Sequence, residues 1–125
     1  MSATVEITLD ATDVEAAVAF WRAALGYERL YDRDPFVVLG PPPGDTRPSV
    51  LIQRVDRVTA DKSPVHLDLR SDDPDAEVAR LIALGATIQY QVDDRARGGG
   101  RWTTLTDPQG TVFCVAPARL TTPSG

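Results

Sequence analysis

The chain has 125 residues, of which 42% are hydrophobic and 25% charged, and its formal net charge is −5. This length predicts one domain with its own hydrophobic core. An acidic chain lacks the clustered basic surface of nucleic-acid-binding proteins, and no apolar run reaches the roughly 20 residues that a membrane span needs. One cysteine and one histidine exclude an internal disulfide and any site built on two histidines of one chain. We therefore expect a cytoplasmic protein with neither a nucleic-acid nor a membrane partner.

An internal repeat organises the chain. The stretch VEITLDATDVEAAVAFWRAALGYERL, which starts at Val5, matches VHLDLRSDDPDAEVARLIALGATIQY, which starts at Val65. The offset is 60 residues at first, and it becomes 59 at the glycine that follows each helical stretch, because the second copy has lost one residue. We predict two repeats, about residues 1–60 and 61–117, followed by a short tail.

The first repeat predicts a strand, a helix and three more strands. Val5, Ile7 and Leu9 alternate with polar residues, as in a strand whose apolar side faces a helix. A helix is expected from about Asp13, with Asp13 or Thr12 as its N-cap, to Gly26, a suitable C-cap. Its apolar stripe is Val14, Ala17, Val18, Trp21 and Leu25, and Phe20 is expected in the core with Trp21. The later strands are expected at residues 27–31, 36–39 and 49–55, with a proline-rich loop at 40–45.

The second repeat predicts the same order. Its first strand has Val65, Leu67 and Leu69 in alternation. Its helix is capped by Asp73, has Pro74 in its first turn and is followed by Gly85, with an apolar stripe of Val78, Leu81 and Ile82. Its later strands are expected at residues 86–92, 102–106 and 112–116, with a flexible loop at 95–101 and a turn at 107–110.

Strand alternation predicts a polar face that points away from the helices. In the first repeat this face carries Glu6, Thr8 and Asp10, and in the second it carries His66, Asp68 and Arg70. Glu6 and His66 occupy equivalent positions, so we expect them to face each other across a concave surface. The same alternation turns Val50, Ile52, Phe113 and Val115 toward the helices, and Leu51, Gln53, Val112, Cys114 and Ala116 toward the cleft.

The repeat, the segment DATDVEAAVAFWRAALGY, the strand VHLDL and the ending WTTLTDPQGTVFCV resemble the vicinal oxygen chelate superfamily. This superfamily contains glyoxalases, bleomycin-resistance proteins and extradiol dioxygenases. The sequences of these segments are most similar to its glyoxalase-like subgroup. The resemblance runs from about Val5 to Ala116. It implies an α+β fold in which two βαβββ modules form an open, eight-stranded, barrel-like sheet around one cleft, with the helices outside. It also implies a homodimer, in which the two modules of a cleft come from one chain or from two.

The resemblance further implies four metal-ligand positions, which in this sequence are Glu6, Gln53, His66 and Cys114. Metal-dependent relatives have carboxylates where this chain has Gln53, a neutral amide, and Cys114, a thiol. A divalent metal prefers charged or deprotonated ligands, so a complete metal site is not expected. Glu6, His66 and Cys114 keep a zinc site open as an alternative. Extradiol dioxygenase activity is excluded, because its iron needs two histidines.

We therefore predict a glyoxalase-like protein that binds a small molecule in the cleft and sequesters a drug or metabolite. Two alternatives stay open: a metal-dependent lyase or isomerase that uses Glu6 and His66, and a metal-free enzyme in which this pair transfers protons. No catalytic residue and no cofactor is assigned. Trp102 is expected at the cleft mouth as a stacking surface, and Cys114 is expected to act as a small buried apolar residue rather than a nucleophile. The predicted ligand-binding residues are Glu6, Thr8, Gln53, His66, Asp68, Trp102 and Cys114.

Overall fold

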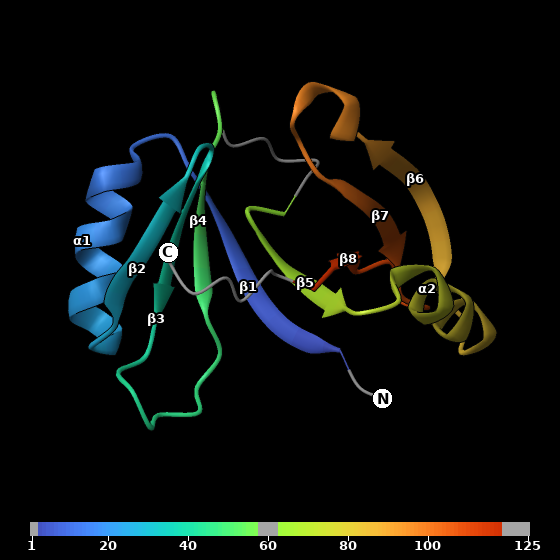
Figure 1. Cartoon of the computed structure of the whole chain (residues 1–125), viewed down its shortest axis with the longest axis horizontal. Coiled ribbons are helices and arrows are strands. Elements are labelled where there is room, and N and C mark those ends of the chain that lie inside the picture. The colour runs from blue at the N-terminus through green and yellow to red at the C-terminus, as the bar shows by residue number, and fades with distance from the viewer. Residues whose placement is uncertain (1–2, 58–62, 119–125) are drawn as a thin grey trace. The chain divides into compact units, whose positions relative to one another are not determined.

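The computed structural model describes residues 3–57 and 63–118. In chain order the elements are β-α-β-β-β, twice, with one short 3₁₀ helix in the second copy (Figure 1). This confirms the predicted α+β class and the repeated βαβββ order. The described residues fall into two compact units, an N-terminal unit of residues 5–67 and a C-terminal unit of residues 3–4 and 68–118. In this part of the chain, neither helix has the length and the apolar character to cross a membrane.

The N-terminal unit is a four-stranded mixed sheet with one helix on one face (Figure 1). The strands lie in the order β2-β3-β4-β1, in which β1 and β4 are parallel and the other neighbours are antiparallel. The elements are β1 (Thr4–Ala11), α1 (Val14–Leu25), β2 (Glu28–Arg33), β3 (Phe36–Gly40) and β4 (Val50–Arg54).

Local signals fix both ends of α1, as the sequence predicted. The Asp13 side chain accepts a hydrogen bond from the backbone N–H of Ala16 at 3.1 Å, which satisfies one of the donors that a helix leaves free at its start. Gly26 ends the helix with φ of 67°, in the left-handed region, and its N–H donates to the carbonyl of Arg22.

The core of the N-terminal unit lies between α1 and the sheet. The predicted stripe of α1 packs there, with Val18 fully buried. Val50 and Ile52 belong to this core, whereas Leu51 between them is buried on the opposite face, as strand alternation requires. The buried core residues are Val18, Tyr27, Val37, Leu39, Val50 and Ile52.

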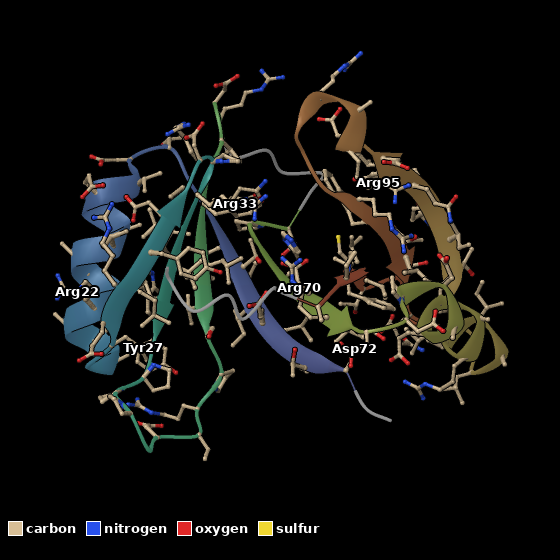
Figure 2. All side chains as sticks on the ribbon, viewed as in Figure 1. Arg22, Tyr27, Arg33, Arg70, Asp72 and Arg95 are labelled. Carbon is tan, nitrogen blue, oxygen red and sulfur yellow. The ribbon has the colours of Figure 1, made fainter. Side chains whose placement is uncertain are left out.

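Tyr27, labelled in Figure 2, closes the end of this core. Its hydroxyl donates to the carbonyl of Pro48 at 2.6 Å, and the guanidinium of Arg47 lies 4.8 Å from its ring centre. A buried tyrosine requires a partner for its hydroxyl, and the loop before β4 supplies this partner.

Two predictions about this core are wrong. Phe20 is 62% exposed, because it lies on the face of α1 turned away from the sheet. Its ring is nearly perpendicular to that of Trp21, with 5.1 Å between the two centroids. Val5 is exposed because the pairing of β1 with β4 begins only at Ile7, so this first part of β1 lies outside the core under α1.

The C-terminal unit repeats the arrangement. Its strands lie in the order β5-β8-β7-β6, and α2 packs mainly on β8. Asp73 caps α2 by accepting from the N–H of Ala76 at 3.1 Å, and Pro74 occupies the first helical position, as predicted. The elements are β5 (Val65–Ser71), α2 (Pro74–Ala83), β6 (Thr87–Asp93), η1 (Arg95–Arg97), β7 (Arg101–Thr106) and β8 (Val112–Pro117), and the boundary between the units falls inside β5.

The core of the C-terminal unit is smaller than that of the N-terminal unit. It is built from Val78, Leu105 and Val115, with the partly buried Leu69, Leu81, Ala86 and Phe113 around them. This confirms that Phe113 and Val115 face α2. Ile82, predicted in the stripe of this helix, is exposed, and so are Val65 and Leu67 of β5, because this small core reaches only Leu69 on that strand.

The two connections around β7 are ordered turns. Residues 95–97 form a 3₁₀ helix where the sequence predicted a flexible loop, and backbone bonds join Asp94 to Gly99 and Gly100 at 2.9 and 2.8 Å. The predicted turn at 107–110 is confirmed, because the Asp107 carboxylate accepts from the N–H groups of Gln109 and Thr111 at 2.8 Å each. These turns connect β7 to its antiparallel neighbours, β6 and β8.

Candidate functional site

The face of the N-terminal sheet opposite α1 is polar along β1. Glu6 and Thr8 are buried there, although neither belongs to the apolar core. Gln53 lies on the same face, because it is the direct partner of Asp10 across the β1–β4 pair. Three residues predicted to bind a ligand, Glu6, Thr8 and Gln53, therefore share one face of this unit.

Asp10 adds an acceptor to this face. Its Oδ1 atom is buried and, among the described residues, has no hydrogen-bond partner. An unpaired buried carboxylate oxygen is costly, so its presence points to a ligand or water as its partner. Sequence alternation placed Asp10 on this face, but nothing in the sequence separated it from an ordinary solvated aspartate.

The corresponding face of the C-terminal unit carries Asp68, Thr104 and Cys114. Asp68 is 7% exposed and Thr104 is 2% exposed. Thr104 and Cys114 are direct partners across the β7–β8 pair, and the hydroxyl and the thiol form a hydrogen bond of 3.4 Å. Trp102 precedes Thr104 by two residues on β7, so its side chain lies on the same face and is partly exposed.

His66, Asp68 and Cys114 could hold a metal ion. Within the described residues, this is the group of donors whose ligand atoms, one per residue, all lie within 4.8 Å of one another. His66 and Asp68 are two residues apart on β5, so alternation gives them the same face. The sequence named His66 and Cys114 as candidate metal ligands in a site not expected to be complete, and Asp68 only as a ligand-binding residue. Glu6 and Gln53 stay predictions as metal ligands.

The chemistry of this donor group fits zinc. A thiolate, an imidazole and a carboxylate are all zinc ligands, and two ligand atoms on a tetrahedral zinc are about 3.5 Å apart. Since 4.8 Å is the upper limit of their separations, the donor atoms need to approach by about 1.3 Å at most, which side-chain rotation can provide. Three protein ligands leave the fourth position free, as in catalytic zinc sites.

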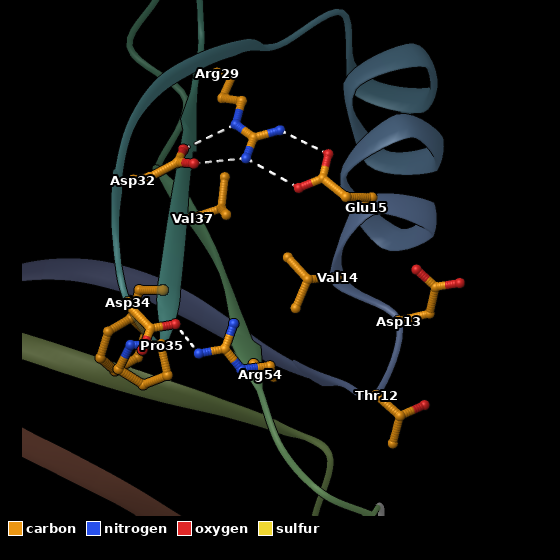
Figure 3. Close-up of a pocket in the computed structure, with 11 residues that line it drawn as sticks. Thr12, Asp13, Val14, Glu15, Arg29, Asp32, Asp34, Pro35, Val37 and Arg54 are labelled. Carbon is orange, nitrogen blue, oxygen red and sulfur yellow. Dashed lines mark hydrogen bonds and ion pairs between the residues drawn. The ribbon is translucent and has the colours of Figure 1, made fainter.

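A separate pocket of about 500 Å³ opens beside the start of α1 in the N-terminal unit (Figure 3). Arg29 lines this pocket and is held by two carboxylates: it donates to Asp32 at 2.8 and 2.7 Å and to Glu15 at 2.9 and 3.0 Å. These bonds lower the pKa of Glu15 and of Asp32 and raise that of Arg29. Figure 3 also shows Arg54 paired with Asp34 on the other side of the pocket.

Arg29 is paired with Glu15 and Asp32, and Arg54 is paired with Asp34, so we assign the Arg29 pairs a bracing role between α1 and β2. The C-terminal unit has a similar brace, in which Arg101 of β7 donates to Asp75 in the first turn of α2 at 3.2 Å. It borders a smaller pocket of about 160 Å³. A brace at the start of each helix explains these residues without a ligand.

Comparisons with known proteins agree with this architecture. The chain is similar to a glyoxalase/bleomycin resistance protein/dioxygenase superfamily member from Vibrio splendidus, with 19% identity, a TM-score of 0.61, and 93% of this chain and 99% of that chain covered. It is also similar to the methylmalonyl-CoA epimerase of Streptomyces coelicolor, with 20% identity, a TM-score of 0.64, and coverage of 94% and 98%. The methylmalonyl-CoA epimerase of Mycobacterium tuberculosis gives 18% identity, a TM-score of 0.63, and coverage of 94% and 88%.

These identities establish a shared fold and nothing about activity. No curated protein sequence matches the chain. The family model described as a glyoxalase-like domain matches residues 6–116, which is nearly the whole of both units. The chain therefore belongs to the glyoxalase-like domain family.

Proposed function

We propose that this protein binds a small organic molecule on the polar sheet face that carries Asp68, Thr104 and Cys114. The observation that carries the proposal is the burial of Asp68 beside hydroxyl, thiol and imidazole groups, on the face opposite the apolar core. Burying a carboxylate is costly unless it has a polar partner, so such a cluster is more typical of a binding site than of a structural core. The buried Oδ1 atom of Asp10 supports the same role for the polar face of the N-terminal unit.

The second function that we propose is a metal-dependent lyase or isomerase. The group formed by His66, Asp68 and Cys114 favours it, because these three donors suit zinc. A bound zinc ion would supply a Lewis acid for a carbonyl or enolate oxygen. Methylmalonyl-CoA epimerase is among the proteins of similar fold, which makes an isomerase the more specific form of this second function.

Zinc titration separates the two functions. If the protein is a metal-dependent lyase or isomerase, we expect it to bind zinc after a chelator has removed any metal. Each of the variants His66→Ala, Asp68→Asn and Cys114→Ser should then abolish zinc binding. Asp72→Asn, which removes an exposed carboxylate outside the donor group, is the control and should bind normally. Zinc at 100 times its Kd would stabilise the fold by about 2.7 kcal/mol, which thermal unfolding detects. No zinc binding in any form of the protein would reject the metal-dependent function.

Small-molecule binding is tested by a fragment screen on ¹⁵N-labelled protein. We expect bound fragments to shift the backbone resonances of Asp68, Thr104 and Cys114. Hits confined to the pocket beside α1 would contradict the proposal. A homodimer and a cytoplasmic location are also proposed, and light scattering tests the first of these.

A further inference from the structure

A β-bulge determines which way Tyr90 points. In the β6–β7 pair Ile88 is opposite Leu105, but the next pair is Tyr90 with Thr104, so Gln89 is an extra residue in β6. Without this bulge, alternation would put Tyr90 on the face of Ile88 and Leu105, under α2. With it, Tyr90 shares the face of Thr104, and it is 49% exposed.

The N-terminal unit contains the same device. Arg29 is opposite Leu39, the next pair is Tyr31 with Val38, and Leu30 is the extra residue. Tyr31 and Tyr90 are 59 residues apart, the offset of the repeat at this point. Both repeats therefore use a bulge to place a tyrosine on the sheet face opposite the helix. Bulges occur often beside functional sites, where they re-aim a side chain.

Trp102 shares this face with Tyr90, on the neighbouring strand. It is the direct partner of Val92, while Tyr90 pairs with Thr104, so the two aromatic residues are diagonal neighbours on adjacent strands. Side chains in this relation are within reach of each other when they are aromatic. Trp102 is 37% exposed, so both rings offer surface to a ligand.

The rest of this face is uncharged across β6, β7 and β8. In a chain with 25% charged residues this is unusual. The charged residues Asp93 and Arg101 lie on the same two strands, where they are opposite each other in the register, but their side chains are on the other face. The uncharged residues that share the face with Tyr90 and Trp102 are Thr87, Val92, Thr104, Thr106, Val112, Cys114 and Ala116.

We propose that Tyr90 and Trp102 form an aromatic shelf that selects a ligand with a flat, uncharged, unsaturated ring. This rests on the proposed small-molecule binding and names the class of ligand. Two exposed rings at diagonal positions of neighbouring strands leave apolar surface in water, and a planar ring covers it best because its face stacks on theirs. The hydroxyl of Thr104 and the thiol of Cys114 border the shelf, so oxygen substituents at one edge of the ring would find polar partners there.

The test uses naphthalene-2,3-diol as the probe and its saturated analogue, decahydronaphthalene-2,3-diol, as the matched compound. The chain has two tryptophans, so the ¹⁵N-labelled protein gives two indole signals, and Trp102→Phe assigns them. We expect the aromatic diol to move the Trp102 signal and leave that of Trp21 in place. We also expect the saturated diol to bind more weakly.

Affinity measurements on variants complete the test. Tyr90→Leu and Trp102→Leu should each weaken binding of the aromatic diol by about 2- to 10-fold, the range for one aromatic pair. Trp102→Phe should lose less, because it keeps a ring. Phe20→Leu, at an exposed aromatic residue on α1, is the control and should leave the affinity unchanged.

Three results would overturn the proposed aromatic shelf: equal binding of the two diols, unchanged affinity in both leucine variants, or no binding of the aromatic diol at millimolar concentration. These are distinct from failure of the proposed function. If other fragments shift Thr104 and Cys114 while the shelf variants bind them normally, the shelf is wrong and small-molecule binding stands. If no molecule binds on this face, both are wrong.

Discussion

Replacing Leu105 with alanine tests the register of β7, on which the polar face and the shelf both depend. Leu105 is fully buried and packs with Val78 and Val115 in the core of the C-terminal unit. Truncation removes three buried carbon atoms and leaves a cavity, and in a well-packed core this costs about 3–4 kcal/mol. Unfolding of 125 residues carries an entropy of roughly 0.26 kcal/mol/K, so the Tm should fall by about 13 °C.

The assay is thermal and urea unfolding of both Leu105→Ala and Leu84→Ala. Leu84 is 67% exposed, so the same chemical change at this position should cost less than about 0.5 kcal/mol. Equal small losses in the two variants would refute the reasoning, because Leu105 would then not be in the core. A slip of one residue in β7 would produce that result and would also move Thr104 and Trp102 to the face of α2.

Three further predictions concern local structure and pH. Asp13→Ala should cost about 0.5–2 kcal/mol in urea unfolding, because the N–H of Ala16 loses its cap, whereas Asp13→Ser should keep most of the stability. Gly26→Ala should cost about 1–2 kcal/mol in the same assay, from the left-handed backbone alone, because an added Cβ would meet no atom within 4 Å. The Arg95 side chain lowers the pKa of Asp93 to about 2, and backbone N–H groups of Thr111 and Gln109 lower that of Asp107. Because these pKa values are lower in the folded state, their stabilisation is complete above the unfolded values near pH 4 and is lost as the pH falls toward 2. Acid titration of Tm should show a smaller loss in Asp93→Asn than in the unchanged protein.

The elements that carried local signals were predictable. Asp13 and Gly26 fix the ends of α1 through bonds to residues three or four positions away, so their effect can be read without knowledge of the fold. Alternation assigned Val50, Leu51 and Ile52 to the correct faces of β4, because each residue of a regular strand reverses direction.

The errors occurred where packing partners decide the outcome. Phe20 and Ile82 lie beside apolar stripes, but the width of a buried stripe depends on how much of each helix the sheet covers. The bulge at Gln89 has no glycine to announce it, and one extra residue reverses the face of every later position in β6. Asp68 entered the donor group only once β8 was known to be the neighbour of β5.

In each repeat, the tyrosine that follows the bulge begins a row of cross-strand partners, and the side chains of this row differ in polarity between the two repeats. Starting from each bulge, cross-strand partners form equivalent rows, Tyr31–Val38–Leu51 in the N-terminal unit and Tyr90–Thr104–Cys114 in the C-terminal unit. The first row ends in two buried aliphatic side chains, which have no donor or acceptor to offer a ligand. The second ends in a hydroxyl bonded to a thiol, beside a buried carboxylate. Because a polar ligand atom needs such partners, Thr104 and Cys114 suit this row to the proposed binding, whereas Val38 and Leu51 at the equivalent positions offer none.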